Sequence, residues 1–212
     1  MGGRGGPSNM SGGGTYSEIT GSQEDMVIHM NEGPTAINGQ LSEAEVDALS
    51  KYHYGDAVVM NNALRNGEDT GGGFSQSDLN NIDSAIQKGS LKENTVLYRG
   101  IPKQFVGVDF SNPESAVGKT FTDKGYSSFS ASKDVANEYS NGAVLRMNAK
   151  QGTKAAFVDG AINSKSELRE FARDGDAGNF ECLIGRKQKY KVTGYSRRGN
   201  RIEYNIEMVG SR

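Results

Sequence analysis

The chain has 212 residues, enough for one domain with its own hydrophobic core, and its formal net charge of -2 lacks the basic excess of nucleic-acid-binding proteins. No apolar run approaches the roughly 20 residues that span a bilayer. A single cysteine excludes an intramolecular disulfide, and two histidines without a cysteine cluster argue against a zinc site. We therefore expect no nucleic-acid or membrane partner, and a chemistry that uses neither a metal nor a histidine base.

The start of the chain is rich in glycine, with 8 of the first 21 residues, and nearly lacks apolar residues. A segment of this composition buries too little apolar surface to offset the entropy lost on ordering. We therefore expect residues 1–22 to form a flexible glycine-rich tail and residues 23–212 to form a single domain. The segment Met1–Gly6 also lacks the apolar stretch of a secretory signal peptide.

Helical patterns dominate the first half of the chain. The capping box Ser42–Glu45 predicts the start of one helix, a second helical segment is expected over 56–65, and apolar residues at helical spacing predict a third that ends at Gly89. Tyr52 and Tyr54 lie in the first of these helices. We interpret them as packing residues, since helix tyrosines serve in packing more often than in stacking on a ligand.

Strand patterns replace the helical ones from about residue 94. The clearest strand is 201–209, where apolar and polar residues alternate as in a half-buried strand. Short helices are expected over 132–140 and 165–172. The other strand candidates are 94–99, 125–130, 143–148, 154–159, 180–185 and 188–194. Helices followed by mostly antiparallel strands predict an α+β domain.

Three of the strand candidates each contain one polar residue with catalytic chemistry. Arg99 ends an apolar strand before Gly100, and an arginine fork binds phosphate or carboxylate through two parallel hydrogen bonds. Ser128 has no histidine beside it in sequence, so it is not expected to be a nucleophile. Glu181 interrupts an apolar strand, where a carboxylate needs a partner or a function. Taken singly, each also has an ordinary explanation: a surface ion pair, a solvated edge strand and a paired sheet carboxylate.

In their order along the chain, these segments together resemble the arginine–serine–glutamate class of mono-ADP-ribosyltransferases, the family of the clostridial C3-like exoenzymes and of binary-toxin enzymatic components. The matching segments are Asn61 with Leu64-Arg65, Tyr98-Arg99-Gly100, Ser128-Phe129-Ser130 and Asn179-Phe180-Glu181. The resemblance covers about residues 42–210. It implies the ADP-ribosyltransferase fold, in which N-terminal helices pack on a core of two mostly antiparallel β-sheets.

The resemblance implies that NAD is the co-substrate, and it gives the matching residues roles in binding it. Arg99, helped by Arg65, would hold the diphosphate, and Gly100 would contact the nicotinamide amide through its backbone. The implied binding set is completed by Asn61, Ser128 and Ser130.

The implied catalytic set is Glu181, Ser128, Arg99 and Asn179. Glu181 would hydrogen-bond the nicotinamide-ribose hydroxyl and stabilise the cationic sugar that forms when nicotinamide leaves, as carboxylates do in glycoside cleavage. Ser128 would orient Glu181.

Asn179 departs from the family pattern, which has glutamate or glutamine two residues before the catalytic glutamate. That residue faces the acceptor, and in several members glutamate goes with arginine acceptors. Asparagine donates and accepts hydrogen bonds but cannot serve as a general base. We therefore expect an acceptor other than arginine. The preceding loop, 171–178, is expected to contact the acceptor.

These motifs are compatible with three functions. The first is transfer of ADP-ribose from NAD to a protein acceptor in a bacterial or other host cell, the second is NAD glycohydrolysis, and the third is a non-catalytic virion-associated or interaction module of the same fold. The glycine-rich start resembles, in style only, small transferases of bacteriophages and prophages. We expect a monomer that acts in the host cytoplasm if phage-encoded, or that is delivered by another route.

Overall fold

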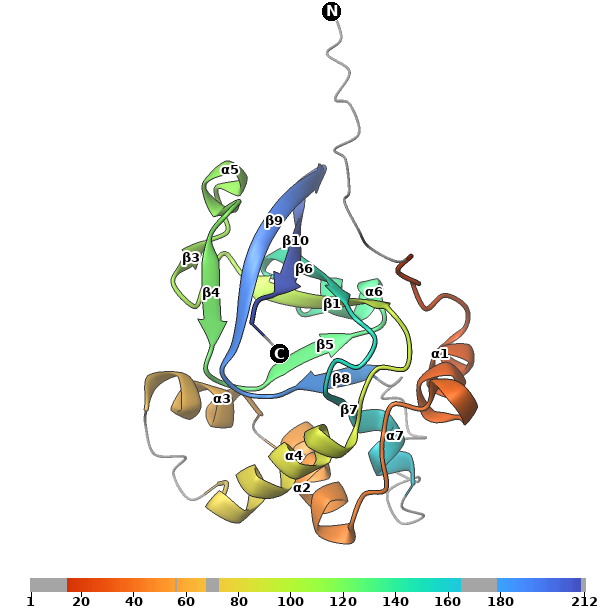
Figure 1. The fold of residues 1–212 in the computed structure, drawn as a ribbon. Helices are drawn as coiled ribbons and strands as arrows, with labels where there is room; N and C mark the ends of the chain where they lie inside the picture. The colour runs from red at the N-terminus through yellow and green to blue at the C-terminus, as the bar shows by residue number, and fades with distance from the viewer. Residues whose placement is uncertain (1–14, 56, 68–72, 165–178, 211–212) are drawn as a thin grey trace, which may run out of the picture.

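The computed structural model describes residues 15–55, 57–67, 73–164 and 179–210 (Figure 1). The helices are α1 (Gln23–Asn31), the 3-10 helix η1 (Gly33–Thr35), α2 (Glu43–Tyr54), α3 (Ala57–Asn66), α4 (Gln76–Lys88), α5 (Pro113–Ala116), α6 (Lys133–Glu138) and α7 (Val158–Asn163). The strands are β1 (Thr95–Pro102), β2 (Gln104–Phe105), β3 (Val108–Asp109), β4 (Thr120–Asp123), β5 (Ser127–Ser130), β6 (Gly142–Ala149), β7 (Ala155–Phe157), β8 (Glu181–Ile184), β9 (Gln188–Arg198) and β10 (Arg201–Met208). This order confirms the expected α+β class.

Eight strands form one sheet in the order β4-β9-β10-β6-β1-β5-β8-β7, and β2 pairs with β3 in a separate hairpin. Neighbouring strands of the sheet are antiparallel except β10 and β6, which are parallel. The half with β6 and β1 joins the half with β5, β8 and β7 through the register pair Tyr98↔Ser130. The two sheets expected from the resemblance are thus joined into one continuous sheet. Beyond the pair Tyr98↔Ser130, β1 and β5 separate.

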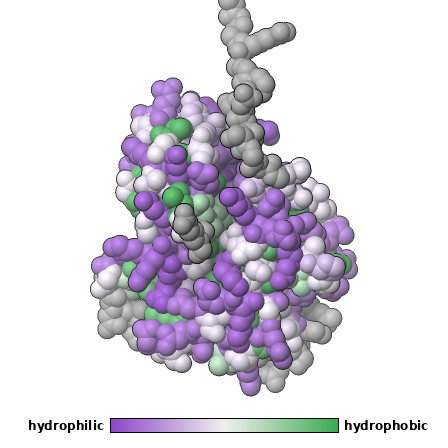
Figure 2. All heavy atoms as spheres, in the orientation of Figure 1, coloured by the Kyte–Doolittle hydropathy of each residue, from purple (hydrophilic) through white to green (hydrophobic). Residues whose placement is uncertain are grey.

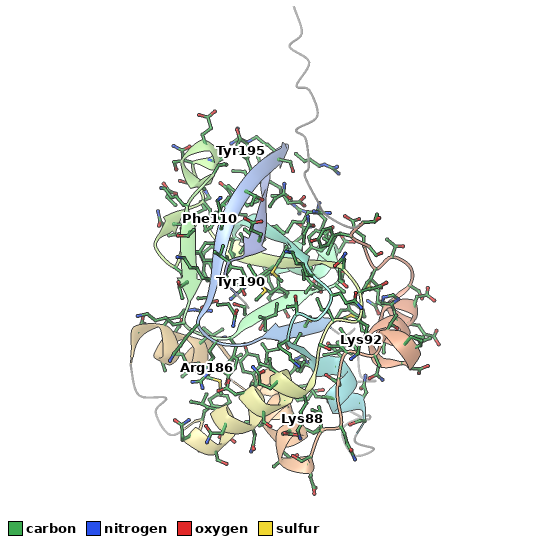
Figure 3. The ribbon with its side chains drawn as sticks, in the orientation of Figure 1. Lys88, Lys92, Phe110, Arg186, Tyr190 and Tyr195 are labelled. Atoms are coloured by element: carbon green, nitrogen blue, oxygen red, sulfur yellow. The ribbon has the colours of Figure 1, made fainter. Side chains whose placement is uncertain are left out.

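Helices α2, α4 and α7 cover one face of the β5-β8-β7 half (Figure 1). Their buried side chains, among them Leu49 and Ile82, pack in one cluster with Leu183 of β8. Full burial of one such side chain contributes about 1.5–3 kcal/mol to stability. A larger apolar cluster lies on the other face of the sheet, and it includes Tyr190, which Figure 3 labels near the middle of the molecule.

Three of the helices begin with capping boxes. Ser42 caps α2, as the sequence predicts, and Ser22 and Ser75 cap α1 and α4 in the same way. Gly89 follows α4, also as predicted, but its backbone is extended rather than left-handed. Glycine is needed there because a Cβ would lie 2.0 Å from the carbonyl oxygen of Ala155.

One carboxylate ties β5 and β8 to helix α4. Arg186, which follows β8 and is labelled in Figure 3, donates through its guanidinium to both oxygens of Asp83 in α4. The Tyr126 hydroxyl, just before β5, donates to Asp83 at 2.8 Å. This link places the strands that carry Ser128 and Glu181 against the helical layer.

Parts of the chain differ from the sequence-based expectations. Ser17 pairs with Thr95 in a β-bridge and α1 starts after Ser22, so the flexible tail expected over 1–22 does not extend through residues 15–22. The strand expected over 154–159 ends at Phe157, and the chain continues as α7. A short apolar run has no periodicity that distinguishes helix from strand. The helix expected over 165–172 lies outside the described residues.

No helix in the described ranges is long and apolar enough to cross a bilayer. On the face drawn in Figure 2, hydrophilic residues predominate and hydrophobic ones gather only in small groups. The described part of this face therefore lacks the large apolar patch that is typical of a stable subunit interface.

Candidate active site

Arg99 and Ser128 stand where β1 and β5 separate. The register pair Tyr98↔Ser130 joins the two strands. Arg99 is the next residue after Tyr98 on β1, and Ser128 precedes Ser130 by two residues on β5. Gly100 comes next on β1, and a Cβ there would lie 2.3 Å from the carbonyl oxygen of Ala136 in α6. Glycine at this position therefore allows α6 to pack on β1. The contact of Gly100 with nicotinamide that the resemblance implies stays a prediction.

Asp123 holds the two arginines that the resemblance assigns to the diphosphate. Arg65 of α3 donates from Nε to Asp123 Oδ1 at 2.8 Å and from Nη2 to Oδ2 at 3.0 Å, and Arg99 donates from Nη1 to Oδ2 at 2.9 Å. Both guanidinium groups also lie over the Phe105 ring, at 5.4 and 4.9 Å from its centroid. Two cations on one carboxylate leave a net positive charge, which fits an anionic ligand.

The Asp123 carboxylate is ionised although its side chain is 0% exposed. Burial raises the pKa of a carboxyl, but the hydrogen bonds and charges of Arg65 and Arg99 outweigh it and hold the pKa of Asp123 below its ordinary value. The sequence reasoning missed this residue. The signal was present, because Asp123 shares a strand face with Phe121, an inward apolar position.

Ser128 is bonded to a tyrosine of helix α2. The hydroxyl oxygens of Ser128 and Tyr52 are 3.0 Å apart, and the Asn61 amide donates to the Tyr52 hydroxyl at 2.8 Å. Asn61 also accepts from the Tyr126 backbone N–H at 2.8 Å, which fixes the orientation of its amide. Tyr52 is a buried packing residue, as expected, but its hydroxyl joins two predicted site residues, which the sequence reasoning missed. Burial and the nearby Glu181 charge raise the pKa of Tyr52 to about 12.

His53, rather than Ser128, contacts the Glu181 carboxylate. His53 Nδ1 lies 3.0 Å from Glu181 Oε2, and the two side chains are only 9% and 11% exposed. Among the described residues, the direct contact from Ser128 to Glu181 that the resemblance implies is therefore replaced by one from a histidine. The sequence reasoning expected no histidine base and did not place a histidine at this carboxylate; the absence of a histidine base stays a prediction. No local pattern could have found the contact, because 128 residues separate the pair.

Asp159 of α7 holds the backbone of Glu181. The Glu181 N–H donates to Asp159 Oδ2 at 2.6 Å, at the first residue of β8. Asp159 is buried, and this burial, together with the neighbouring Glu181 charge, raises its pKa to about 6. Like Glu181, Asp159 interrupts an apolar run, so the same sequence signal was available for it.

Ser130 and Tyr139 position Asn179. The Ser130 hydroxyl donates to the Asn179 backbone carbonyl at 2.7 Å, and the Tyr139 hydroxyl donates to Asn179 Oδ1 at 3.3 Å. Phe180, the next residue, has a φ of 46°, which turns the chain sharply into β8. Ser130 thus fixes the backbone just before β8. The contact of Ser130 with NAD that the resemblance implies stays a prediction. The loop 171–178 lies outside the described residues.

Residues 31–208 match the model of the ADP-ribosyltransferase exoenzyme family. The chain belongs to this family. It is an NAD-dependent mono-ADP-ribosyltransferase of the toxin type, as the resemblance implied.

Solved structures of this type share the fold of this ADP-ribosyltransferase. The Clostridium limosum C3 exoenzyme has a TM-score of 0.70 at 20% identity, over 93% of this chain and 98% of that one. Plx2a, an ADP-ribosyltransferase toxin from Paenibacillus larvae, has a TM-score of 0.61 at 20% identity, over 80% and 88%. Exoenzyme S from Pseudomonas aeruginosa has a TM-score of 0.60 at 21% identity, over 88% and 81%. No curated protein matches the sequence.

Proposed function

We propose that this ADP-ribosyltransferase binds NAD on its paired arginines and transfers ADP-ribose to a protein side chain other than arginine. The observation that carries the proposal is the cluster of Arg65 and Arg99 on the buried Asp123 carboxylate. This cluster lies where β1 and β5 separate, and Ser128 lies on β5 beside the same point. A nucleotide diphosphate needs donors in this arrangement, and arginine forks match its oxygens. Exoenzyme S, which shares the fold, has been solved bound to carba-NAD.

Glu181 is proposed to stabilise the sugar when the nicotinamide–ribose bond breaks. NAD supplies the bond that is cleaved, and the chain supplies a fixed carboxylate. Its backbone is held by Asp159 and its side chain by His53, so little reorganisation is needed when positive charge develops. Ser128, Tyr52 and Asn61 form a continuous set of hydrogen-bonding groups that would fix the bound dinucleotide and the helices around it.

Asn179 is proposed to select the acceptor. Its Oδ1 accepts from Tyr139, which leaves the amide N–H groups as donors toward the acceptor. A donor pair complements a side chain with an oxygen acceptor, such as an amide or a hydroxyl. It does not complement arginine, whose guanidinium has five donors and no acceptor. The donor pair on Asn179 therefore favours an acceptor other than arginine.

NAD glycohydrolysis is the second candidate, since the same residues would serve it with water as the acceptor. Incubation of the pure protein with labelled NAD and a host lysate separates the two. Labelled proteins are expected, with the modified residue type identified by mass spectrometry. Free ADP-ribose without labelled protein would favour the hydrolase, and modified arginines would contradict the role of Asn179.

The third candidate, a non-catalytic module, is tested by Glu181→Gln. We expect this variant to release nicotinamide at least about 100-fold more slowly than the wild-type protein. Equal rates, or no cleavage by the wild type, would support the non-catalytic candidate. A monomeric state, a phage origin and action in a host cytoplasm stay predictions.

A further inference from the structure

His53 belongs to none of the family motifs, yet its side chain contacts the carboxylate of Glu181, the proposed catalytic residue. His53 sits near the end of α2, and its Nδ1 is 3.0 Å from Glu181 Oε2. Both side chains are largely buried, at 9% and 11% exposure. A buried carboxylate keeps its charge and its orientation only with a good hydrogen-bond donor.

Ser128, which would supply such a donor, has another partner. Its hydroxyl lies 3.0 Å from the Tyr52 hydroxyl, and Tyr52 is held in turn by Asn61. Tyr52 and His53 are consecutive residues of α2. One turn of this helix therefore supplies a partner both to Ser128 and to Glu181, and the two contacts are set by the same backbone.

We infer that His53 is a positioning residue for Glu181 in the proposed reaction, on which this inference rests. Nδ1–H of the imidazole donates to Oε2, which engages one carboxylate oxygen and leaves the other for the ribose hydroxyl. Asp159 fixes the Glu181 backbone at 2.6 Å, so the backbone and the carboxylate of Glu181 are held from two different helices, α7 and α2.

A purely structural role for His53 is the alternative. Its ring packs edge to face on Tyr54, with centroids 4.8 Å apart, and loss of this packing would lower stability without a selective effect on turnover. The two roles differ in what an isosteric replacement restores. Asparagine places an amide nitrogen the same number of bonds from Cβ as histidine Nδ1, but it lacks the ring.

The test compares His53→Ala and His53→Asn in nicotinamide release. His53→Ala should lower kcat about tenfold to a hundredfold, as expected when a reacting group loses its orientation. The KM for NAD should stay within about threefold of the wild-type value, because the contacts that bind NAD equally in the ground state and the transition state are unaffected. His53→Asn should recover most of kcat. The matched control is His29→Ala, which removes the chain's other histidine from its half-exposed hydrogen bond with Glu93 and should leave kcat unchanged.

Two results would overturn the inference while the proposed function stands: an unchanged kcat in His53→Ala, or an Asn variant as slow as the Ala variant. A spectroscopic readout covers the case in which the wild type does not cleave NAD. Because the chain has two histidines, the ¹⁵N spectrum of labelled protein with His29→Ala reports on His53 alone. We expect a protonated Nδ1 whose signal moves in Glu181→Gln. An unprotonated Nδ1, or a signal that does not move, would contradict the contact independently of activity.

Discussion

The guanidinium of Arg65 and the buried carboxylate of Asp123 make two parallel hydrogen bonds, of 2.8 and 3.0 Å, that join helix α3 to the end of strand β4. The same carboxylate accepts from Arg99 on β1. An acidic residue thus brings together two arginines that are 34 positions apart in the chain, and without it their like charges would repel.

Asp123→Asn keeps the shape of this side chain and removes its charge. We expect the free energy of unfolding to fall by about 1.5–3 kcal/mol, because the three charge-assisted hydrogen bonds from Arg65 and Arg99 become weaker. We also expect weaker NAD binding, since the arginines lose their common anchor. Urea denaturation and calorimetric titration with NAD measure the two effects. Glu207→Gln, an exposed carboxylate on β10, is the control and should change stability by less than about 0.5 kcal/mol. An unchanged Kd for NAD in Asp123→Asn would show that the arginines are not organised by this residue.

Tyr52→Phe and Ser128→Ala remove the two hydroxyls of one hydrogen bond. If Ser128 acts through Tyr52, each variant should lower kcat for nicotinamide release by about tenfold, and the double variant should lose little more than either single one. Steady-state kinetics on the four proteins gives the coupling. Losses that multiply would indicate that the two hydroxyls act independently.

Asp159 should make stability depend on pH in the direction opposite to a salt-bridged carboxylate. Its folded-state pKa is raised to about 6, above the ordinary value near 4, so the folded state binds the proton more tightly. This group therefore adds stability as the pH falls from about 6 to 4, up to about 3 kcal/mol. Asp159→Asn does not titrate but can still accept from the Glu181 N–H. The variant should exceed the wild type in stability most at pH 7, and the difference should shrink at pH 5. Urea denaturation at both pH values measures it, and a constant difference would exclude Asp159 as the titrating group.

Tyr139→Phe should affect transfer more than NAD hydrolysis. Loss of its hydrogen bond to Asn179 Oδ1 frees the amide to rotate, and a bond of about 1 kcal/mol corresponds to about fivefold in transfer rate. The measurement is the ratio of protein-bound to free ADP-ribose. Tyr195→Phe, an exposed tyrosine of β9 labelled in Figure 3, is the control and should leave the ratio unchanged. Equal loss of transfer and hydrolysis in Tyr139→Phe would place Tyr139 in NAD cleavage instead.

Local patterns predicted the elements that their own residues stabilise. The capping box at Ser42 and the spacing of Leu79, Ile82 and Ile86 predicted α2 and α4, because a helix is bonded within a few residues. The alternation over 201–209 predicted β10. Short elements such as β4 and α7 were missed, since four to six residues give no reliable period.

By itself, the sequence determined the fold class, the family and the order of Arg99, Ser128 and Glu181 along the chain. Only the tertiary structure decided their partners: Asp123 for the arginine, Tyr52 for the serine, and His53 with Asp159 for the glutamate. The reason is physical. A motif reflects chemistry that a few adjacent residues must supply, whereas the pKa and orientation of a buried group depend on residues brought near it by packing, at separations from 22 to 128 positions in these four contacts.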